Sequence, residues 1–260
     1  MSDTSGSLAY PFRHRAWLGR VLVGAALDAI PVVLMLPAVF ALARHRYLLP
    51  FHSVVLVSGA AAVGVAGRLL VLGYLGRAAR EVIDGTSTGL PPWDRMAEDL
   101  VQGIKLALVA LALWLPAVGA TVVLALLVMA LASPSLAWLP VILVGPPAAL
   151  LTLAYLPAGL LAMVTEGEAS AAFDFERVTG VAGRAFGPYA IAFLVAFGAE
   201  ILAQLGLVLC CVGIFATRFA AHCVAVHAFG SAYRQGLTAD AGAAGAQPGA
   251  GLPAEPPPAL

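Results

Sequence analysis

The sequence contains few charged residues for its length. Charged side chains make up 11% of its 260 residues and apolar side chains 61%, whereas an ordinary soluble domain has about 25% charged and about 45–50% apolar residues. The formal net charge is zero, so the composition gives no general basis for binding nucleic acid. Together with a mean hydropathy of +0.94, this shortage of charge argues against a soluble globular domain and indicates a protein of the lipid bilayer.

Cysteine is also scarce, because the chain has three, at Cys210, Cys211 and Cys223. An odd and small number gives no disulfide framework, and such thiols usually serve as small packing side chains in apolar helices. Cys223 and His227 are four residues apart and share a helix face, which is near enough to chelate a metal. Because only these two ligands are evident, the sequence predicts packing and interhelical hydrogen bonding there, and no metal site.

The sequence also lacks the common catalytic motifs. It contains no HExxH, no phosphate-binding glycine-rich loop and no recognisable Ser/His/Asp set. Glu166, Glu168, Asp174 and Glu176 cluster between apolar blocks, and such a charge run is typical of a solvated loop. We therefore predict no catalytic residue, no bound cofactor and no enzymatic activity.

Long apolar blocks are what the sequence has in abundance. About 20 apolar residues suffice to cross a bilayer as a helix, and six blocks of about this length or more occur. The predicted spans are about 18–43, 54–76, 106–131, 136–164, 189–209 and 212–233. This pattern predicts an all-α, polytopic transmembrane helix bundle within 18–235, preceded by an N-terminal cytoplasmic or interfacial segment (1–20) and followed by a disordered Ala/Gly/Pro-rich tail (236–260). Prolines interrupt the fourth span heavily, so the course of residues 132–164 is left open.

Two segments have the pattern of amphipathic helices that lie on a membrane surface. In residues 93–104, apolar side chains recur at helical spacing from Trp93 to Ile104, with charged side chains between them. In residues 170–186, Ser170 is a candidate helix cap before a second apolar stripe. Both helices are expected on the cytoplasmic side of the membrane.

The residues in and before the first two spans predict anchoring and packing. Aromatic and basic residues precede the first span, Tyr10 among them, which suits the aromatic belt at a membrane surface. Small residues recur at four-residue spacing in the second span, as in the pairs Ala60/Gly64 and Ala62/Ala66. Such stripes let another helix approach closely in lipid.

The distribution of lysine and arginine predicts the orientation. With six spans, both termini and both long polar loops lie on one side, and this side holds ten such residues against two on the other. The ten are Arg13, Arg15, Arg20, Arg77, Arg80, Arg95, Lys105, Arg177, Arg184 and Arg234, and the two are Arg44 and Arg46. Because positively charged loops stay in the cytoplasm, we expect a multi-pass protein of the cell membrane with both termini cytoplasmic.

Four charged residues lie inside predicted spans: Asp28, Arg68, Glu200 and Arg218. A charge at the bilayer centre costs about 2.5–3.5 kcal/mol on insertion scales, so each is expected to have a compensating role. Asp28 and Arg68 lie at matching depths in consecutive spans and are predicted to pair, and Glu200 with Arg218 is a second candidate pair. An ion pair that locks the bundle is the favoured interpretation, and the alternatives are a substrate or proton path and snorkelling to the interface.

Short motifs along the chain resemble a known family. They are, in order, Tyr10-Pro11-Phe12-Arg13 with Trp17-Leu18-Gly19, Ile30-Pro31, Gly73-Tyr74-Leu75, Arg77-Ala78-Ala79-Arg80, Leu90-Pro91, Trp93-Asp94, Gly103-Ile104-Lys105, Ala171-Ala172-Phe173-Asp174-Phe175 and Tyr233-Arg234. Over about residues 8–235 the chain is similar to the bacterial and archaeal integral membrane proteins of the domain of unknown function 4013 family. The 42 positions between Pro31 and Gly73 depart from the family pattern, in which these two motifs lie close together. The resemblance implies a membrane location and carries over no activity and no catalytic residue.

Two classes of function fit these observations. The first is a non-catalytic membrane protein that organises or assists partners, and the second is a small-molecule transporter or channel-like protein that uses the intramembrane charges. The expected partners are the lipid bilayer and proteins whose identity the sequence does not reveal; nucleic acid is not expected, and a homo-oligomer stays open. A transporter predicts a polar cavity where broken helices meet, whereas an organising protein predicts a packed bundle with an exposed cytoplasmic patch.

Overall fold

The computed structural model describes residues 4–44, 51–131, 133–136, 138–207 and 213–245, and the secondary structure in these ranges is entirely helical. The predicted all-α fold is confirmed. The longer helices are α2 (Trp17–Arg44), α3 (Phe51–Asp84), α4 (Met96–Leu131), α6 (Gly145–Glu166), α8 (Phe186–Gln204) and α9 (Gly213–Gly245). The shorter elements are α1 (Thr4–Ala9), η1 (Tyr10–Phe12), η2 (Pro134–Leu136), α5 (Trp138–Leu143), η3 (Ala169–Phe173), α7 (Phe175–Arg184) and η4 (Leu205–Leu207).

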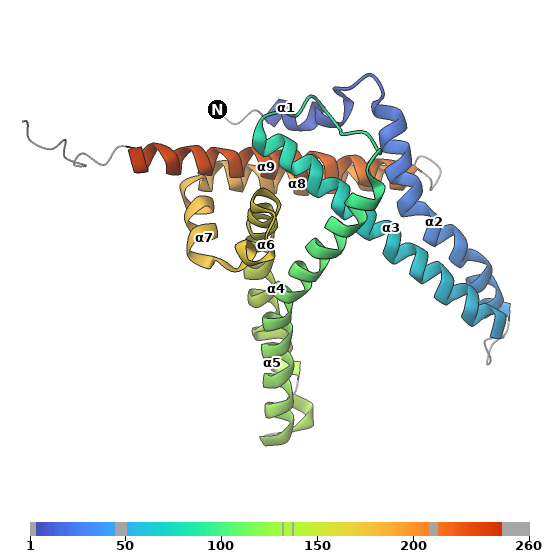
Figure 1. Ribbon diagram of the computed structural model, residues 1–260. Coiled ribbons are helices and arrows are strands. Elements are labelled where there is room, and N and C mark those ends of the chain that lie inside the picture. Colours follow the sequence, from blue (N-terminus) through green and yellow to red (C-terminus); the bar gives the residue numbers. More distant parts are fainter. Residues whose placement is uncertain (1–3, 45–50, 132, 137, 208–212, 246–260) are drawn as a thin grey trace, which may run out of the picture.

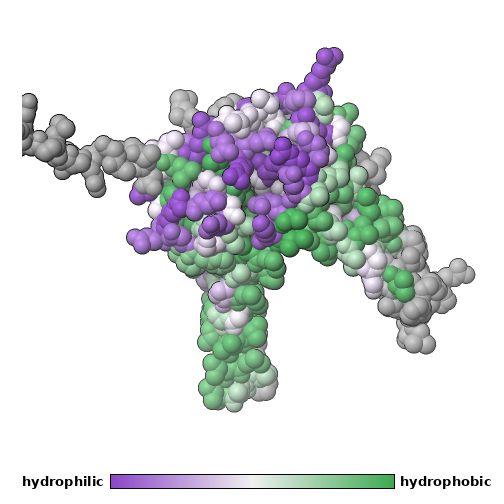
Figure 2. All heavy atoms as spheres, viewed as in Figure 1, coloured by the Kyte–Doolittle hydropathy of each residue, from purple (hydrophilic) through white to green (hydrophobic). Residues whose placement is uncertain are grey.

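Helix α9 lies at the centre of the molecule, where it packs against α1, α2, α3, α6, α7 and α8. Two legs diverge from this centre (Figure 1). One is the hairpin of α2 and α3, and the other, the α4–α6 leg, consists of the C-terminal part of α4 with α5 and α6. Both legs are apolar, and polar residues gather over the end at which they meet (Figure 2). We call this end the polar cap; it comprises segments 4–16, 85–95 and 167–185, which pack around the second half of α9.

Five helical stretches of the described chain are long and apolar enough to cross a membrane. They are Trp17–Leu36, Val57–Asp84, Met96–Leu131, Trp138–Glu166 and Phe186–Leu207. They correspond to the first five predicted spans. The sixth predicted span, 212–233, falls mostly on α9, which is not among the five. Its apolar stretch is interrupted by Arg218, His222 and His227, and α9 runs across the direction of the α4–α6 leg (Figure 1).

Helix α4 differs from the prediction in its start and in the face that it buries. It begins at Met96, three residues after the predicted start of the surface helix 93–104, and runs unbroken into the third span, as that helix was expected to do. Met96, Val101 and Ile104 are exposed, whereas Asp99 is 2% exposed. The apolar face is outside and the charged Asp99 inside because the surroundings of this helix are lipid. A helix in lipid turns its apolar stripe outward and its polar side chain toward a protein partner. Figure 1 also shows α4 changing direction along its length, and Pro116 lies inside this helix.

Several other boundaries differ from the predicted ones. Helix α3 continues to Asp84, through residues expected to form a polar loop. Helix α9 continues to Gly245, into the segment predicted as a disordered tail from residue 236, whose remainder lies outside the described residues. The cap of α7 is Asp174, not Ser170: the Asp174 side chain accepts a hydrogen bond from the Arg177 backbone N–H at 3.1 Å.

The proline-rich fourth span is built from two helices that follow each other in the sequence. Helix α5 ends at Leu143, and α6 begins at Gly145, so that Pro146 and Pro147 occupy its first turn. Proline is tolerated there because the first N–H groups of a helix have no partner within it. Gly167, with φ 79°, then ends α6 in the left-handed conformation that favours glycine.

The largest buried side chains on the hairpin side are aromatic. Tyr10, Tyr74 and Phe219 are each 0% exposed and come from η1, α3 and α9. The prediction that Tyr10 belongs to the aromatic belt is therefore wrong, because its ring is enclosed by protein. Its hydroxyl donates to the Gly89 carbonyl at 3.2 Å, and burial raises the pKa of Tyr10 to about 12, which keeps the phenol protonated.

One of the two small-residue stripes on α3 faces another helix. Ala60 is 2% exposed, and a Cβ added to Gly64 would lie 2.8 Å from the Pro31 Cβ of α2. Ala62 and Ala66 are exposed. The close approach of α2 to α3 therefore uses the Ala60/Gly64 stripe.

Candidate functional site

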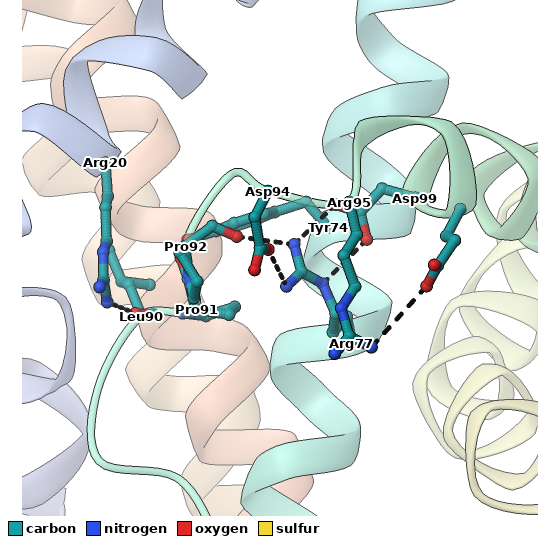
Figure 3. Close-up of polar contacts among 10 residues, drawn as sticks. Arg20, Tyr74, Arg77, Leu90, Pro91, Pro92, Asp94, Arg95 and Asp99 are labelled. Carbon is teal, nitrogen blue, oxygen red and sulfur yellow. Dashed lines mark hydrogen bonds and ion pairs between the residues drawn. The ribbon is translucent and has the colours of Figure 1, made fainter.

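Arg77 joins three parts of the chain near the polar end of α3. Its Nε donates to Asp99 Oδ1 at 2.9 Å and its Nη2 to Asp99 Oδ2 at 2.7 Å, which makes a bidentate pair with α4. Its Nη1 donates to Asp94 Oδ1 at 3.2 Å and its Nη2 to the Pro92 carbonyl at 2.8 Å (Figure 3). We call this set the Arg77 junction. It satisfies both oxygens of the buried Asp99 and ties the 85–95 loop to α3 and α4.

An aromatic stack holds the same loop from the other side. The rings of Tyr74 and Trp93 are stacked, with centroids 3.8 Å apart and planes inclined by 10°. The Tyr74 hydroxyl donates to the Pro91 carbonyl at 2.8 Å, and the Trp93 Nε1 donates to the Arg20 carbonyl at 2.9 Å. The Arg20 guanidinium in turn donates to the Leu90 carbonyl. These contacts connect the start of α2, the loop and α3, so they position the helices relative to one another.

Two glycines let α3 and α4 cross with their backbones in contact. A Cβ added to Gly73 would overlap the Asp99 carbonyl oxygen, and one added to Gly103 would overlap the Leu69 carbonyl oxygen. No side chain fits at either position without separating the helices. The close crossing is what brings the Asp99 carboxylate within reach of Arg77.

The structure brings Asp28 of α2 and Arg68 of α3 together. Arg68 Nη1 lies 3.3 Å from Asp28 Oδ1. The two side chains differ in exposure, since that of Asp28 is 1% exposed and that of Arg68 is 50% exposed. Neither carboxylate oxygen of Asp28 has a hydrogen-bond donor among the described residues, so the ion pair is the compensation that the structure gives this buried charge.

The second candidate pair, Glu200 and Arg218, is not joined. Within the described ranges, Glu200 pairs with His222, whose Nε2 lies 3.1 Å from Glu200 Oε1, and Arg218 is exposed and makes no ion pair. His222 follows Arg218 by four residues, one turn further along α9. The prediction considered only arginine as the partner of Glu200 and therefore overlooked His222. An acid and a histidine in consecutive helices are the sequence signal that could have indicated this pair.

Charged residues from four helices lie around His222. Glu200, Asp28, Arg218 and Arg68 all lie within electrostatic reach of His222. We call the five residues the charge cluster. It combines α2 and α3 with α8 and α9, and its two carboxylates, its histidine and its arginines provide groups that can exchange or attract protons and small ions.

A hydroxyl–imidazole pair that the sequence did not predict lies in the polar cap. Ser7 Oγ is 3.0 Å from His227 Nδ1, and the His227 ring lies 4.6 Å from that of Tyr10, centroid to centroid. Ser7 is 4% exposed, which encloses the hydroxyl that a nucleophile would have to present to a substrate. Cys223, the residue suggested with His227 as a metal ligand, is 0% exposed, and no group of three or more metal-ligating side chains occurs among the described residues.

A large apolar cavity opens where the α4–α6 leg meets the polar cap. Its volume is about 940 Å³, at the upper end of the range for small-molecule sites. It is lined by residues of α4 (112–117), α6 (151–158), η3 and α7 (173–183) and α8 (186–193). The sequence did not indicate this cavity, because its walls come from four separate elements whose residues are ordinary apolar side chains.

Fold and site define the class of this protein: an all-α chain whose described residues include five helices suited to crossing a membrane and a polar cap that joins them. The chain belongs to the family described as protein of unknown function (DUF4013), whose sequence profile matches residues 56–212. No curated protein and no solved structure matches the chain. The match contains the whole Arg77 junction and the cavity walls, whereas Asp28 and all of α9 lie outside it. The family assignment from short motifs is confirmed, over a shorter range than the expected 8–235.

Proposed function

We propose that the protein is a non-catalytic integral membrane protein of the cell membrane that organises or assists partner proteins within the bilayer. The observation that carries this proposal is the low self-burial of its spans. In the most apolar windows of Met96–Leu131 and Trp138–Glu166, 6% of the residues are buried inside the chain. Both windows belong to the α4–α6 leg, which extends away from the rest of the molecule (Figure 1).

The geometry of the two legs supports an assembly role over a solitary one. The legs diverge, so their facing surfaces do not cover each other (Figure 2). Apolar surface of this extent costs nothing in lipid, and helix association in lipid depends on packing with other helices. Between the legs there is therefore room for helices of a partner or of a second copy of the chain.

Site-specific photocrosslinking in native membranes tests this proposal. A photoreactive phenylalanine is placed at Leu115 or Leu126, which are 59% and 54% exposed on α4. Leu113, 8% exposed on the same helix, is the matched control. We expect discrete protein adducts from the two exposed positions and intramolecular products from the control. Lipid adducts alone from both exposed positions would contradict the proposed role.

A second candidate function, transport of a small ion or molecule, is supported by the charge cluster. Asp28 is buried without a hydrogen-bond donor among the described residues, and the Glu200–His222 pair joins α8 to α9, which packs against α2. Intramembrane groups of this kind form proton relays in transporters. Reconstituted vesicles that carry a pH gradient and an internal pH dye test this candidate: the protein should accelerate decay of the gradient, and Asp28→Asn should abolish the acceleration. Equal rates in protein-containing and empty vesicles would exclude proton transport.

A further inference from the structure

The cavity between α4, α6, α7 and α8 holds a hydroxyl group that the protein does not satisfy. Three of the four hydroxyls in its wall donate to backbone carbonyls: Tyr155 to Ala172 at 2.8 Å, Thr152 to Ala148 at 2.9 Å, and Thr179 to Phe175. The fourth, on Tyr189, is buried and has no hydrogen-bond partner among the described residues. A buried hydroxyl without a partner costs about 1–3 kcal/mol, so an additional hydrogen-bonding group at this wall is expected.

The position of the cavity along the helices places it just below a membrane interface. Lys105 is the last charged residue of α4, and the first wall residue of that helix, Ala112, is seven positions further, about 10 Å along a helix. On α6 the charged end is Glu166, which pairs with Arg177 at the start of α7. Tyr189 is the fourth residue of α8, which begins at Phe186. This is the depth of the glycerol esters and first chain carbons of a phospholipid, and tyrosines are enriched there.

The size and lining of the cavity suit a flexible chain and exclude a helix. An α-helix with its side chains is about 10–12 Å wide, so 940 Å³ would hold only about two turns of one. Apart from the four hydroxyls, the wall is made of apolar side chains and glycine. The amphipathic helix α7 covers one side, with Val178 inward and its charged residues on the opposite face.

We propose that this cavity binds one acyl chain of a glycerophospholipid from the leaflet beside the polar cap, and that Tyr189 donates a hydrogen bond to the ester carbonyl of that chain. Tyr189 belongs to the cavity wall and its hydroxyl is buried, so the side chain has to turn for the hydroxyl to meet the lipid. The lipid supplies the missing acceptor and fills the apolar volume. This inference is independent of whether the protein organises partners or transports ions.

Native mass spectrometry of the full-length protein tests the proposal. Delipidated protein is titrated with dioleoyl phosphatidylglycerol and, separately, with its ether-linked analogue, which lacks the carbonyl. We expect one tightly bound ester lipid per chain, with binding of the ether lipid weaker by about two- to tenfold, the worth of one neutral hydrogen bond. Tyr189→Phe should lower ester-lipid affinity to the ether-lipid value and leave ether-lipid affinity unchanged.

Two phenylalanine variants on one helix separate occupancy of the cavity from general lipid contact. Ala112→Phe places a ring in the cavity, whereas Ala120→Phe, at an exposed position of α4 outside the cavity wall, is the control. We expect the tightly bound lipid to be lost from Ala112→Phe and kept by Ala120→Phe, with both variants monodisperse and helical by circular dichroism. Equal lipid retention in these two variants would show that the lipid binds elsewhere. If the difference in affinity between ester and ether lipid persists in Tyr189→Phe, the proposed role of the tyrosine is wrong. A tightly bound ligand other than a phospholipid would also overturn it.

Discussion

At the scale of single residues, the two acid–arginine pairs differ in how evenly their side chains are buried and in how many hydrogen bonds join them. Asp28 is enclosed while its partner Arg68 is half exposed, so the two are unequal members of one ion pair. Arg77 and Asp99 are instead held by two parallel hydrogen bonds, with the arginine 19% and the aspartate 3% exposed. The two pairs are therefore expected to respond differently to substitution.

Removing Arg68 should destabilise the protein more than removing Asp28. Arg68→Gln leaves a buried carboxylate without compensation, at a cost of about 3 kcal/mol. Asp28→Asn leaves a half-exposed guanidinium that can reach the interface, at a cost of about 1 kcal/mol. Adding Asp28→Asn to Arg68→Gln should recover most of the larger loss. The measurement is a double-mutant cycle on unfolding in detergent, and strictly additive effects would rule out the coupling.

Arg77→Lys should destabilise the protein by about 2 kcal/mol although it keeps the charge. A lysine ammonium cannot form the two parallel hydrogen bonds that the Asp99 carboxylate accepts, and one buried oxygen loses its donor. The control is Arg95→Lys, because Arg95 pairs with Glu98 at 3.8 Å where both side chains are exposed. Its effect should stay within about 0.5 kcal/mol. Equal shifts in unfolding temperature for the two variants would contradict the structural role of the Arg77 junction.

Whether the sequence predicted the contacts of these charged residues depends on which residue type is the partner. Asp28 and Arg68 were predicted as partners from their depths along consecutive spans, and the structure places them in contact. The burial of Asp99 was not predicted, because helical spacing separates an apolar face from a charged one without saying which of them meets protein when the solvent is lipid. His222 was overlooked as the partner of Glu200, because its charge depends on a proton that the sequence does not show.

At the scale of elements, the crossing of α3 and α4 has the closest backbone approach at any glycine of the described residues. It depends on Gly73 and Gly103 and on the absence of any side chain between the two backbones. The sequence showed small residues in α3, but spacing alone did not say which of them face another helix. The helix boundaries were also difficult to predict, because the polar residues after Gly76 and after Tyr233 continue helices that leave the apolar region.

Gly73→Ala and Gly103→Ala should each force α3 and α4 apart. The new methyl group overlaps a backbone carbonyl, which has no rotamer to adopt, so the expected loss is about 3 kcal/mol or more. Gly119→Ala is the matched control, since Gly119 lies on the same helix α4 with open space around its Cβ position. That variant should be neutral or up to about 1 kcal/mol more stable, because alanine is the better helix former. Thermal unfolding in detergent measures the stability of all three variants. Unchanged stability in both Gly73→Ala and Gly103→Ala would refute the close contact.

At the scale of the whole molecule, the polar segments that were predicted to share one side do lie together. Tyr10 contacts Gly89, a Cβ on Gly85 would meet Arg234, and a Cβ on Gly236 would meet Val181 of α7. The sequence anticipated this gathering from its arginine and lysine distribution. It did not anticipate α9 as the central helix, because the contacts of α9 with α1, α2, α3 and α6 involve residues far away in the chain.

The polar cap is predicted to face the cytoplasm and the tip of the α4–α6 leg the opposite side. Single cysteines are introduced at Thr88 and Thr238 in and near the cap and at Ser135 at the tip, all three exposed, in a background without Cys210, Cys211 and Cys223. A membrane-impermeant maleimide added to intact cells should label position 135 alone, because lysine- and arginine-rich segments remain inside. Labelling at 88 or 238 without labelling at 135 would invert the proposed orientation.

The contact between Ser7 and His227 spans 220 residues of sequence, and it has a consequence for how the protein is made. A ribosome adds about 5–20 residues per second, so the N-terminal segment waits about 10–40 s before its partner on α9 has been synthesised. During that interval the pocket that Phe219 later fills beside Gly24 is open, and Tyr10 lacks the His227 ring that packs against it. The hairpin and the α4–α6 leg are already joined at the crossing of α3 and α4, so a chain that ended before α9 would lack only the helix around which the polar cap packs.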